Sequence, residues 1–180
     1  AVSLMTIGCG ADIGPQPSGN LSIAEEHGRA IATETKRLLA GNTIALDGAP
    51  TIESRHIKLP LAKPKPRAYW EEQLKSGGFH HQLAKAMMAK LDVSGEIPAE
   101  VNYPVSVWKF GEDLAMVFLA GEVVVDYSVR LKRELDWSRL WLNAWANDMP
   151  GYIPSRRILR EGGYEADFSQ VYYEQPGRYD

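Results

Sequence analysis

The stretch of residues 114–135, LAMVFLAGEVVVDYSVRLKREL, constrains the fold more than any other part of the sequence. Residues 114–119 form a short apolar run that follows the turn residues 111–113, a pattern typical of a strand covered on both faces. From Val123 onward apolar residues recur at roughly helical spacing, and the basic residues stand late in the segment, where the helix dipole favours cations. The pattern predicts a strand, a tight corner at residues 120–122 and an amphipathic helix.

Glu122 lies at this corner, between the carboxyl end of the predicted strand and the amino end of the predicted helix. Ligand-facing groups of α/β proteins are usually found at such positions. A carboxylate at the start of a helix also simply complements the helix dipole. From these residues alone we favour the second, structural interpretation.

The rest of the chain predicts further strands and helices around this unit. Strands are expected at residues 1–7, 51–61, 101–110 and 139–146, and helices at 69–75, 79–91 and 156–161. A capping-box pattern at residues 22–25 and the glycine at position 41 mark the two ends of another helix. The strands 101–110 and 114–119 are expected to form a hairpin. Repeated prolines near residues 60–67 predict an extended connector. We therefore predict an α/β fold, a mixed β-sheet with flanking helices, within one domain over residues 1–180.

Composition excludes several functional classes. The net charge of −3 and an ordinary apolar content give no sign of a nucleic-acid partner or of a disordered tail. No apolar run approaches the roughly 20 residues that a membrane span needs. Cys9 is the single cysteine, so neither an internal disulfide nor a cysteine metal cluster is expected. The sequence starts without Met or a signal peptide, and we expect a mature product or a piece of a longer protein.

The glycine-rich segment GCGADIG at residues 8–14 has an enzyme interpretation of its own. A strand followed by IGCG is similar to the nucleotide loop of S-adenosylmethionine-dependent methyltransferases, with Asp47 as a ribose-binding acid. Such loops lead straight into a helix, whereas Pro15 and Pro17 disfavour helical geometry directly after the segment. The methyltransferase interpretation therefore ranks third among the functions considered.

Three blocks of the sequence resemble motifs of a single family. They are residues 10–15 (GADIGP), residues 120–122 (AGE) with the helix that ends RLKREL, and residues 147–155 with the Tyr-Glu-Ala at 164–166. They resemble the Gly-Asp-Val-Ser-Pro loop, the Pro-Gly-Glu-Phe-Thr corner and the Asn-x-Tyr-x-x-Tyr-x-Thr-Thr loop of the neutral/alkaline non-lysosomal ceramidases. Divergent bacterial ceramidase-like proteins are the nearest in pattern. The order and the approximate spacing agree along nearly the whole chain.

The resemblance implies that this chain is the carboxyl-proximal part of a larger ceramidase-like catalytic domain, in an extracytoplasmic (periplasmic or secreted) protein. The implied partner is the upstream half of the same protein. In the family one Zn²⁺ is held by two histidines, a glutamate and a tyrosine, so Glu122 and Tyr152 would be metal ligands. The zinc-bound water would attack the amide of an N-acyl lipid or a related small-molecule amide. Asp12 and Gly14 would lie at the catalytic loop, and the substrate would meet the two residues Asn147 and Tyr164.

Two departures from the family pattern stand out. The histidine ligands of the family precede the Gly-Asp loop, whereas all four histidines of this chain follow it. Two oxygen ligands alone hold zinc poorly. Gly14 occupies the position of the family's loop serine, so hydroxyl-assisted chemistry is impossible there. The alternative function is therefore a non-catalytic binding or structural domain, in which Glu122 serves the helix and Tyr152 the packing.

Overall fold

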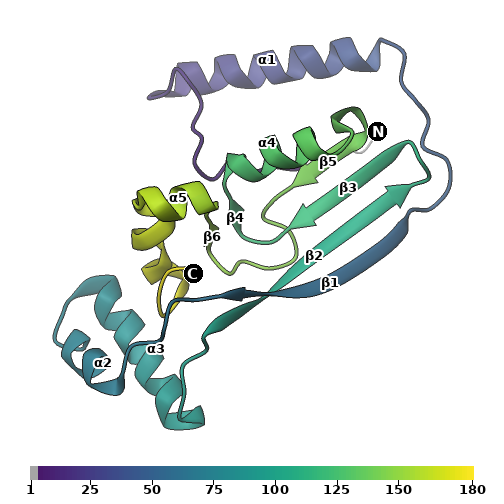
Figure 1. Cartoon of the computed structure of the whole chain (residues 1–180). Coiled ribbons are helices and arrows are strands. Elements are labelled where there is room, and N and C mark those ends of the chain that lie inside the picture. Colours follow the sequence, from purple (N-terminus) through teal and green to yellow (C-terminus); the bar gives the residue numbers. More distant parts are fainter. Residues whose placement is uncertain (1–3) are drawn as a thin grey trace.

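The computed structural model describes residues 4–180 and has the α/β fold that the sequence predicts. Within this range, four strands form a mixed sheet in the order β1–β2–β3–β5, with helices beside it (Figure 1). The strands are β1 Thr51–Pro60, β2 Glu100–Phe110, β3 Leu114–Leu119 and β5 Leu140–Asn143, and a separate parallel pair is formed by β4 Glu122–Val123 and β6 Tyr152–Ile153. The α-helices are α1 Leu21–Leu39, α2 Arg67–Gln73, α3 Gly78–Ser94, α4 Val125–Glu134 and α5 Arg156–Glu161. Shorter helical turns are η1 Trp137–Arg139, η2 Tyr164–Phe168 and η3 Ser169–Tyr173.

The central prediction of strand, corner and helix is confirmed by β3, β4 and α4. The expected hairpin is also present, because β2 and β3 pair antiparallel with Phe110 opposite Leu114. β5 runs parallel to β3, with Leu142 opposite Val117. Parallel neighbours need a crossover connection, and α4 with η1 supplies it. The corner at Glu122 therefore lies where the chain leaves the sheet to make this crossover.

One face of the sheet carries the main core. Tyr103, Leu119 and Leu142 are buried there, together with Val123 and Ile153 from the β4–β6 pair. The other face is more open, and its Trp108 and Trp141 are 37% and 52% exposed. Leu114, Met116 and Phe118 of β3 are half-buried on this face, so the expectation that residues 114–119 are covered on both faces holds only in part. Successive strand side chains alternate between faces, and only one face of β3 meets the core.

A second core lies in the α2–α3 pair. Its buried residues are Trp70, Leu83, Ala84, Met87 and Ile97, and Val171 of η3 packs against them. The chain reaches this pair through the proline-rich connector that the sequence predicts, between Pro60 at the end of β1 and Arg67 at the start of α2. The C-terminal segment thus contacts both cores, because Tyr179 is buried in the first one.

The N-terminal part departs most from expectation. Residues 4–7 are exposed and form no strand, so that part of the prediction is wrong, while residues 1–3 lie outside the described range. The carbonyl oxygen of Ile7 accepts one hydrogen bond, at 2.8 Å, from the amide of Ala144 beyond the end of β5. A single bond to a short edge strand does not extend the sheet. Helix α1 forms as predicted, but Asn20 rather than Ser22 caps it, and none of its residues, all of them described, is buried.

Candidate functional site

Glu122 and Tyr152 lie directly opposite each other in the β4–β6 ladder. The amide of Glu122 donates a hydrogen bond to the carbonyl oxygen of Gly151 at 2.9 Å. Opposite residues of a ladder point to the same side, and neighbouring strands are only about 4.8 Å apart. Two residues thirty positions apart in the sequence are therefore brought together by backbone pairing.

Gly121 allows this pairing, because β4 and the loop before β6 approach very closely beside it. A Cβ built on Gly121 would lie 2.4 Å from the carbonyl oxygen of Gly151, and the φ angle of Gly121 is +70°. Both the position and the left-handed backbone conformation exclude an ordinary side chain. The glycine of the Gly-Glu corner is thus explained by the close contact that places Glu122.

Tyr152 and Tyr173 lie beside this carboxylate, and Tyr164 packs against Tyr152. The rings of Tyr152 and Tyr164 meet edge to face, with centroids 5.3 Å apart and planes at 82°. The ring of Tyr173 lies 6.2 Å from that of Tyr152, at 71°. The hydroxyl of Tyr173 donates a hydrogen bond to Oε1 of Glu122. The ring of Tyr173 also lies over Gly151, where a Cβ would come within 3.2 Å of it.

The surroundings of Tyr152 and Tyr173 favour the neutral form of both phenols. Burial, followed by hydrogen bonding to Glu122 and its negative charge, raises the pKa of Tyr152 well above its usual range. The same causes raise the pKa of Tyr173 to about 12. A phenol that donates its proton to a carboxylate is favoured in the protonated state. The arrangement therefore brings the carboxyl group of Glu122 and the two phenols of Tyr152 and Tyr173 together as oxygen ligands or hydrogen-bonding groups.

Tyr173 is the member of this cluster that the sequence did not single out. The tail carries four tyrosines, at positions 164, 172, 173 and 179, and the Tyr-Glu-Ala motif marks only Tyr164. The neighbouring Tyr172 points elsewhere, since the centroid of its ring lies 4.6 Å from that of Phe79. The end of the short helix η3 decides which of the two adjacent tyrosines reaches Glu122.

Asp12 has a structural contact with the same region. Its Oδ1 accepts a hydrogen bond, at 2.8 Å, from the amide of Val125 at the start of α4. The amide of Ala11 donates to the carbonyl oxygen of Val123 at 3.2 Å. Asp12 thus satisfies an amide that would otherwise lack a helical partner and places its charge at the positive end of the helix dipole. The loop of residues 10–15 is tied to the helix that follows Glu122.

Gly14 and Asn147 have no comparable contacts. Gly14 is exposed, and a Cβ built there would meet no atom within 4 Å among the described residues. Asn147 is exposed as well, and its backbone is left-handed with φ of 70°. Asn tolerates this conformation better than most residues, which accounts for it at the turn. No hydrogen bond described within residues 4–180 joins Gly14 or the Asn147 side chain to Glu122, whereas Tyr164 is brought to the cluster through Tyr152.

Glu122 and Tyr152, the two oxygen ligands implied by the resemblance, lie together, but the implied histidines are not beside them in the described residues. Within residues 4–180, no group of three or more His, Cys, Asp or Glu side chains could hold a metal ion. His27 instead bonds the carbonyl oxygen of Pro17 at 2.8 Å, and His81 bonds that of Leu74 at 2.7 Å. The described chain therefore contains the oxygen half of the implied donor set and lacks its histidine half.

The glycine-rich segment does not form the strand–loop–helix unit of a nucleotide loop in the described residues. Residues 4–20 contain neither a helix nor a strand, and α1 begins only at Leu21. Asp47 is exposed in a segment without regular structure. The described part of the chain also has no helix that is long and apolar enough to cross a membrane.

Comparison with known proteins adds no relative to this description. Neither a family model, nor a curated protein, nor a solved structure matches the chain. The function is therefore argued from the cluster of Glu122 and its tyrosines.

Proposed function

We propose that this chain is the carboxyl-proximal part of a zinc-dependent amide hydrolase of the neutral ceramidase type, which cleaves an N-acyl lipid or a related amide. The observation that carries the proposal is the pairing of Glu122 with Tyr152, the two residues that the resemblance implies as ligands. If the two side chains lay far apart, they could not bind the same ion, and the proposed zinc site would be excluded. An extracytoplasmic location belongs to the same proposal.

The residues of this chain would bind and orient. Tyr173 donates a hydrogen bond to Oε1 of Glu122, and Tyr152 lies opposite Glu122 in the ladder. Tyr164 packs its ring edge to face against Tyr152 and is 47% exposed, so its hydroxyl is available to a substrate. A zinc ion held by the complete donor set would supply a water of lowered pKa for attack on the amide carbon. The two histidines would come from the upstream part of the same protein.

The test is metal analysis and an N-acyl hydrolase assay of this chain, alone and after mixing with the upstream half. We expect about one zinc per complex in the mixture, and little zinc on this chain by itself, because two oxygen ligands are too few. Glu122→Gln and Tyr152→Phe should each abolish or strongly weaken zinc uptake by the mixture. Glu134→Gln and Tyr172→Phe serve as matched controls, since neither side chain touches the cluster among the described contacts.

A mixture that takes up no zinc, or in which Glu122→Gln binds zinc as well as the wild type, would contradict the hydrolase proposal. That outcome would favour the second candidate, a binding or structural domain without a metal site. The specific observation in its favour is that Glu122 already has a protein partner, because the hydroxyl of Tyr173 donates a hydrogen bond to its carboxylate. Under this alternative Glu122→Gln leaves every activity and ligand affinity unchanged.

A further inference from the structure

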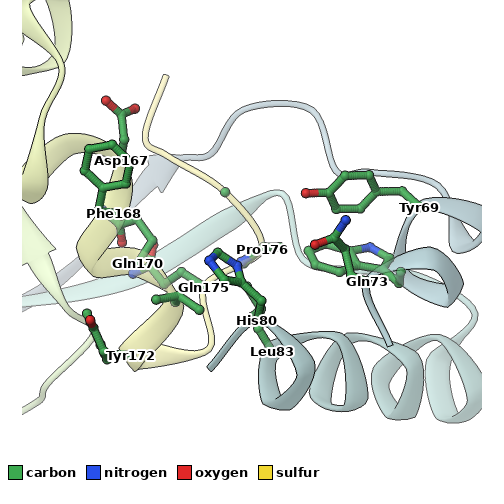
Figure 2. Close-up of a pocket in the computed structure, with 13 residues that line it drawn as sticks. Tyr69, Gln73, His80, Leu83, Asp167, Phe168, Gln170, Tyr172, Gln175 and Pro176 are labelled. Carbon is green, nitrogen blue, oxygen red and sulfur yellow. The ribbon is translucent and has the colours of Figure 1, made fainter. Parts of the chain in front are cut away.

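A pocket of about 320 Å³ lies between the α2–α3 pair and the C-terminal segment (Figure 2). Tyr69 and Gln73 of α2 lie on one side of it, and Phe168 and Gln170 of the C-terminal segment lie on the other. His80 of α3 lies between the two sides. The volume is at the lower end of the range of small-molecule sites. Neither the resemblance nor the Glu122 cluster assigns a role to this pocket.

The pocket is lined by aromatic rings that remain open to solvent. Tyr69, Tyr172 and Phe168 are 41%, 50% and 68% exposed, and they come from separate elements. A phenylalanine this exposed leaves its apolar surface in water, at a cost that a covering ligand removes. The rings favour a ligand that presents an apolar face to them.

Polar side chains without partners line the same pocket. In the part of the chain that the structure describes, neither the carboxamide of Gln73 nor the imidazole of His80 makes a hydrogen bond, although both line the pocket. A carboxamide both donates and accepts, and a neutral imidazole does the same with its two nitrogens. These groups match hydroxyls, which also donate and accept.

The pocket carries little charge. No lysine or arginine is among its lining residues, all of them within the described range. The lining carboxylate of Asp167 accepts a hydrogen bond from Nη1 of Arg178 at 2.9 Å and another from the amide of Gly163 at 3.1 Å. Its charge is thus neutralised by protein partners. A phosphate or carboxylate ligand would find no cation, and an ammonium ligand would find no free anion.

From these three features we infer that the pocket binds a neutral saccharide, with one pyranose ring between α2 and the C-terminal segment. A pyranose has an apolar C–H face for the exposed rings, and its equatorial hydroxyls suit Gln73 and His80. It carries no charge. The inference uses none of the residues of the proposed hydrolase site, so either proposal can fail without the other.

The experiment is a titration of the ¹⁵N-labelled chain with methyl α-D-glucopyranoside, methyl β-D-galactopyranoside and N-acetylglucosamine, followed by NMR. We expect at least one of them to produce saturable shifts in the side-chain amide of Gln73 and the indole N–H of Trp70. Phe168→Ala and Gln73→Ala should each weaken this binding by about 2- to 12-fold, the range for one aromatic contact or one hydrogen bond.

The controls are Trp137→Ala and Gln82→Ala, an aromatic residue 70% exposed and an exposed glutamine that do not line the pocket. Phe168, Trp137 and Gln82 are exposed and Gln73 is half-buried, and an unchanged amide spectrum elsewhere shows that each variant is folded. Tetramethylammonium and inorganic phosphate are the charged probes. The inference is overturned if no saccharide gives saturable shifts, if a charged probe binds more tightly than every saccharide, or if the control variants weaken binding as much as Phe168→Ala.

Discussion

Gly121→Ala tests how the candidate site is built, because this glycine lies where β4 and the loop before β6 approach most closely. Two costs add in the variant. The φ angle of +70° is left-handed, and an alanine there costs roughly 1–2 kcal/mol. The new Cβ would also lie 2.4 Å from the carbonyl oxygen of Gly151, which is backbone and cannot simply rotate away. Forcing such a contact costs about 1–3 kcal/mol more.

The sum predicts that Gly121→Ala lowers the free energy of unfolding by about 2–5 kcal/mol. At about 2–4 °C per kcal/mol for a chain of this size, the melting temperature should fall by roughly 4–20 °C. Urea unfolding followed by circular dichroism gives the free energy, and differential scanning calorimetry gives the melting temperature. An unchanged urea m-value would show that the native state alone is affected.

Two glycines provide matched controls that separate strain from contact. Gly111 has φ of +53° and no atom within 4 Å of a built Cβ, so Gly111→Ala carries the conformational cost alone, about 1–2 kcal/mol. Gly14 has neither feature among the described residues, so Gly14→Ala should change stability by no more than about 0.5 kcal/mol. If Gly121→Ala costs no more than Gly111→Ala, the close approach of Gly121 to Gly151 is refuted, and with it this account of how Glu122 is placed.

Three further predictions concern the surroundings of the cluster. Asp12→Ala should lower the free energy of unfolding by about 0.5–2 kcal/mol, because α4 loses its cap. Asp12→Asn should retain most of that stability in the same urea assay. An equal loss in both variants would exclude capping. Tyr103→Phe should lower the free energy of unfolding by about 1–3 kcal/mol, because the buried hydroxyl of Tyr103 donates to the carbonyl oxygen of Ala120 at 2.8 Å. An unchanged stability of the variant would show that this oxygen has another partner. Burial raises the pKa of the Cys9 thiol from 9.0 to about 11. At pH 8 the native chain should therefore react with iodoacetamide about 100-fold more slowly than the chain unfolded in guanidinium. Equal rates would contradict the burial of Cys9. Because the raised pKa favours the protonated thiol in the native state, its contribution to stability should be complete below pH 9 and should be lost as the pH rises through about 11.

The regular elements were predictable where periodicity was strong. Residues 114–119 and 156–161 were predicted with the bounds that β3 and α5 have, since an apolar run between turns and a short capped segment leave few alternatives. Which faces are covered was not predictable in the same way. A strand with one solvent-exposed face can have the same apolar residues as β3. Which face is buried depends on the elements that pack against the sheet, and the strand's own sequence does not show this. The segment 1–7 shows the same limit, since its residues suit a strand but 4–7 gain only one backbone bond beside β5.

The candidate site was predictable only in part. Glu122 was singled out by its position between a strand and a helix, and both of these elements can be predicted from the neighbouring residues. The two-residue strands β4 and β6 are too short for any period, so their pairing could be reached only through the resemblance. Tyr173 was missed because its contact with Glu122 depends on how η3 ends, with Glu174 in a left-handed conformation. Adjacent tyrosines in a tail look equivalent until the backbone turns one of them inward.

The way in which Glu122 is held separates its structural role from any chemical one. Its backbone is fixed by the hydrogen bond to Gly151, and the helix that follows is capped by Asp12, so neither anchor uses the carboxylate. The side chain itself accepts a hydrogen bond from the hydroxyl of Tyr173. A carboxamide at position 122 retains an oxygen that accepts this bond and removes only the negative charge. The charge is therefore dispensable for the fold by this geometry, so Glu122→Gln can separate a loss of ligand binding from a loss of stability.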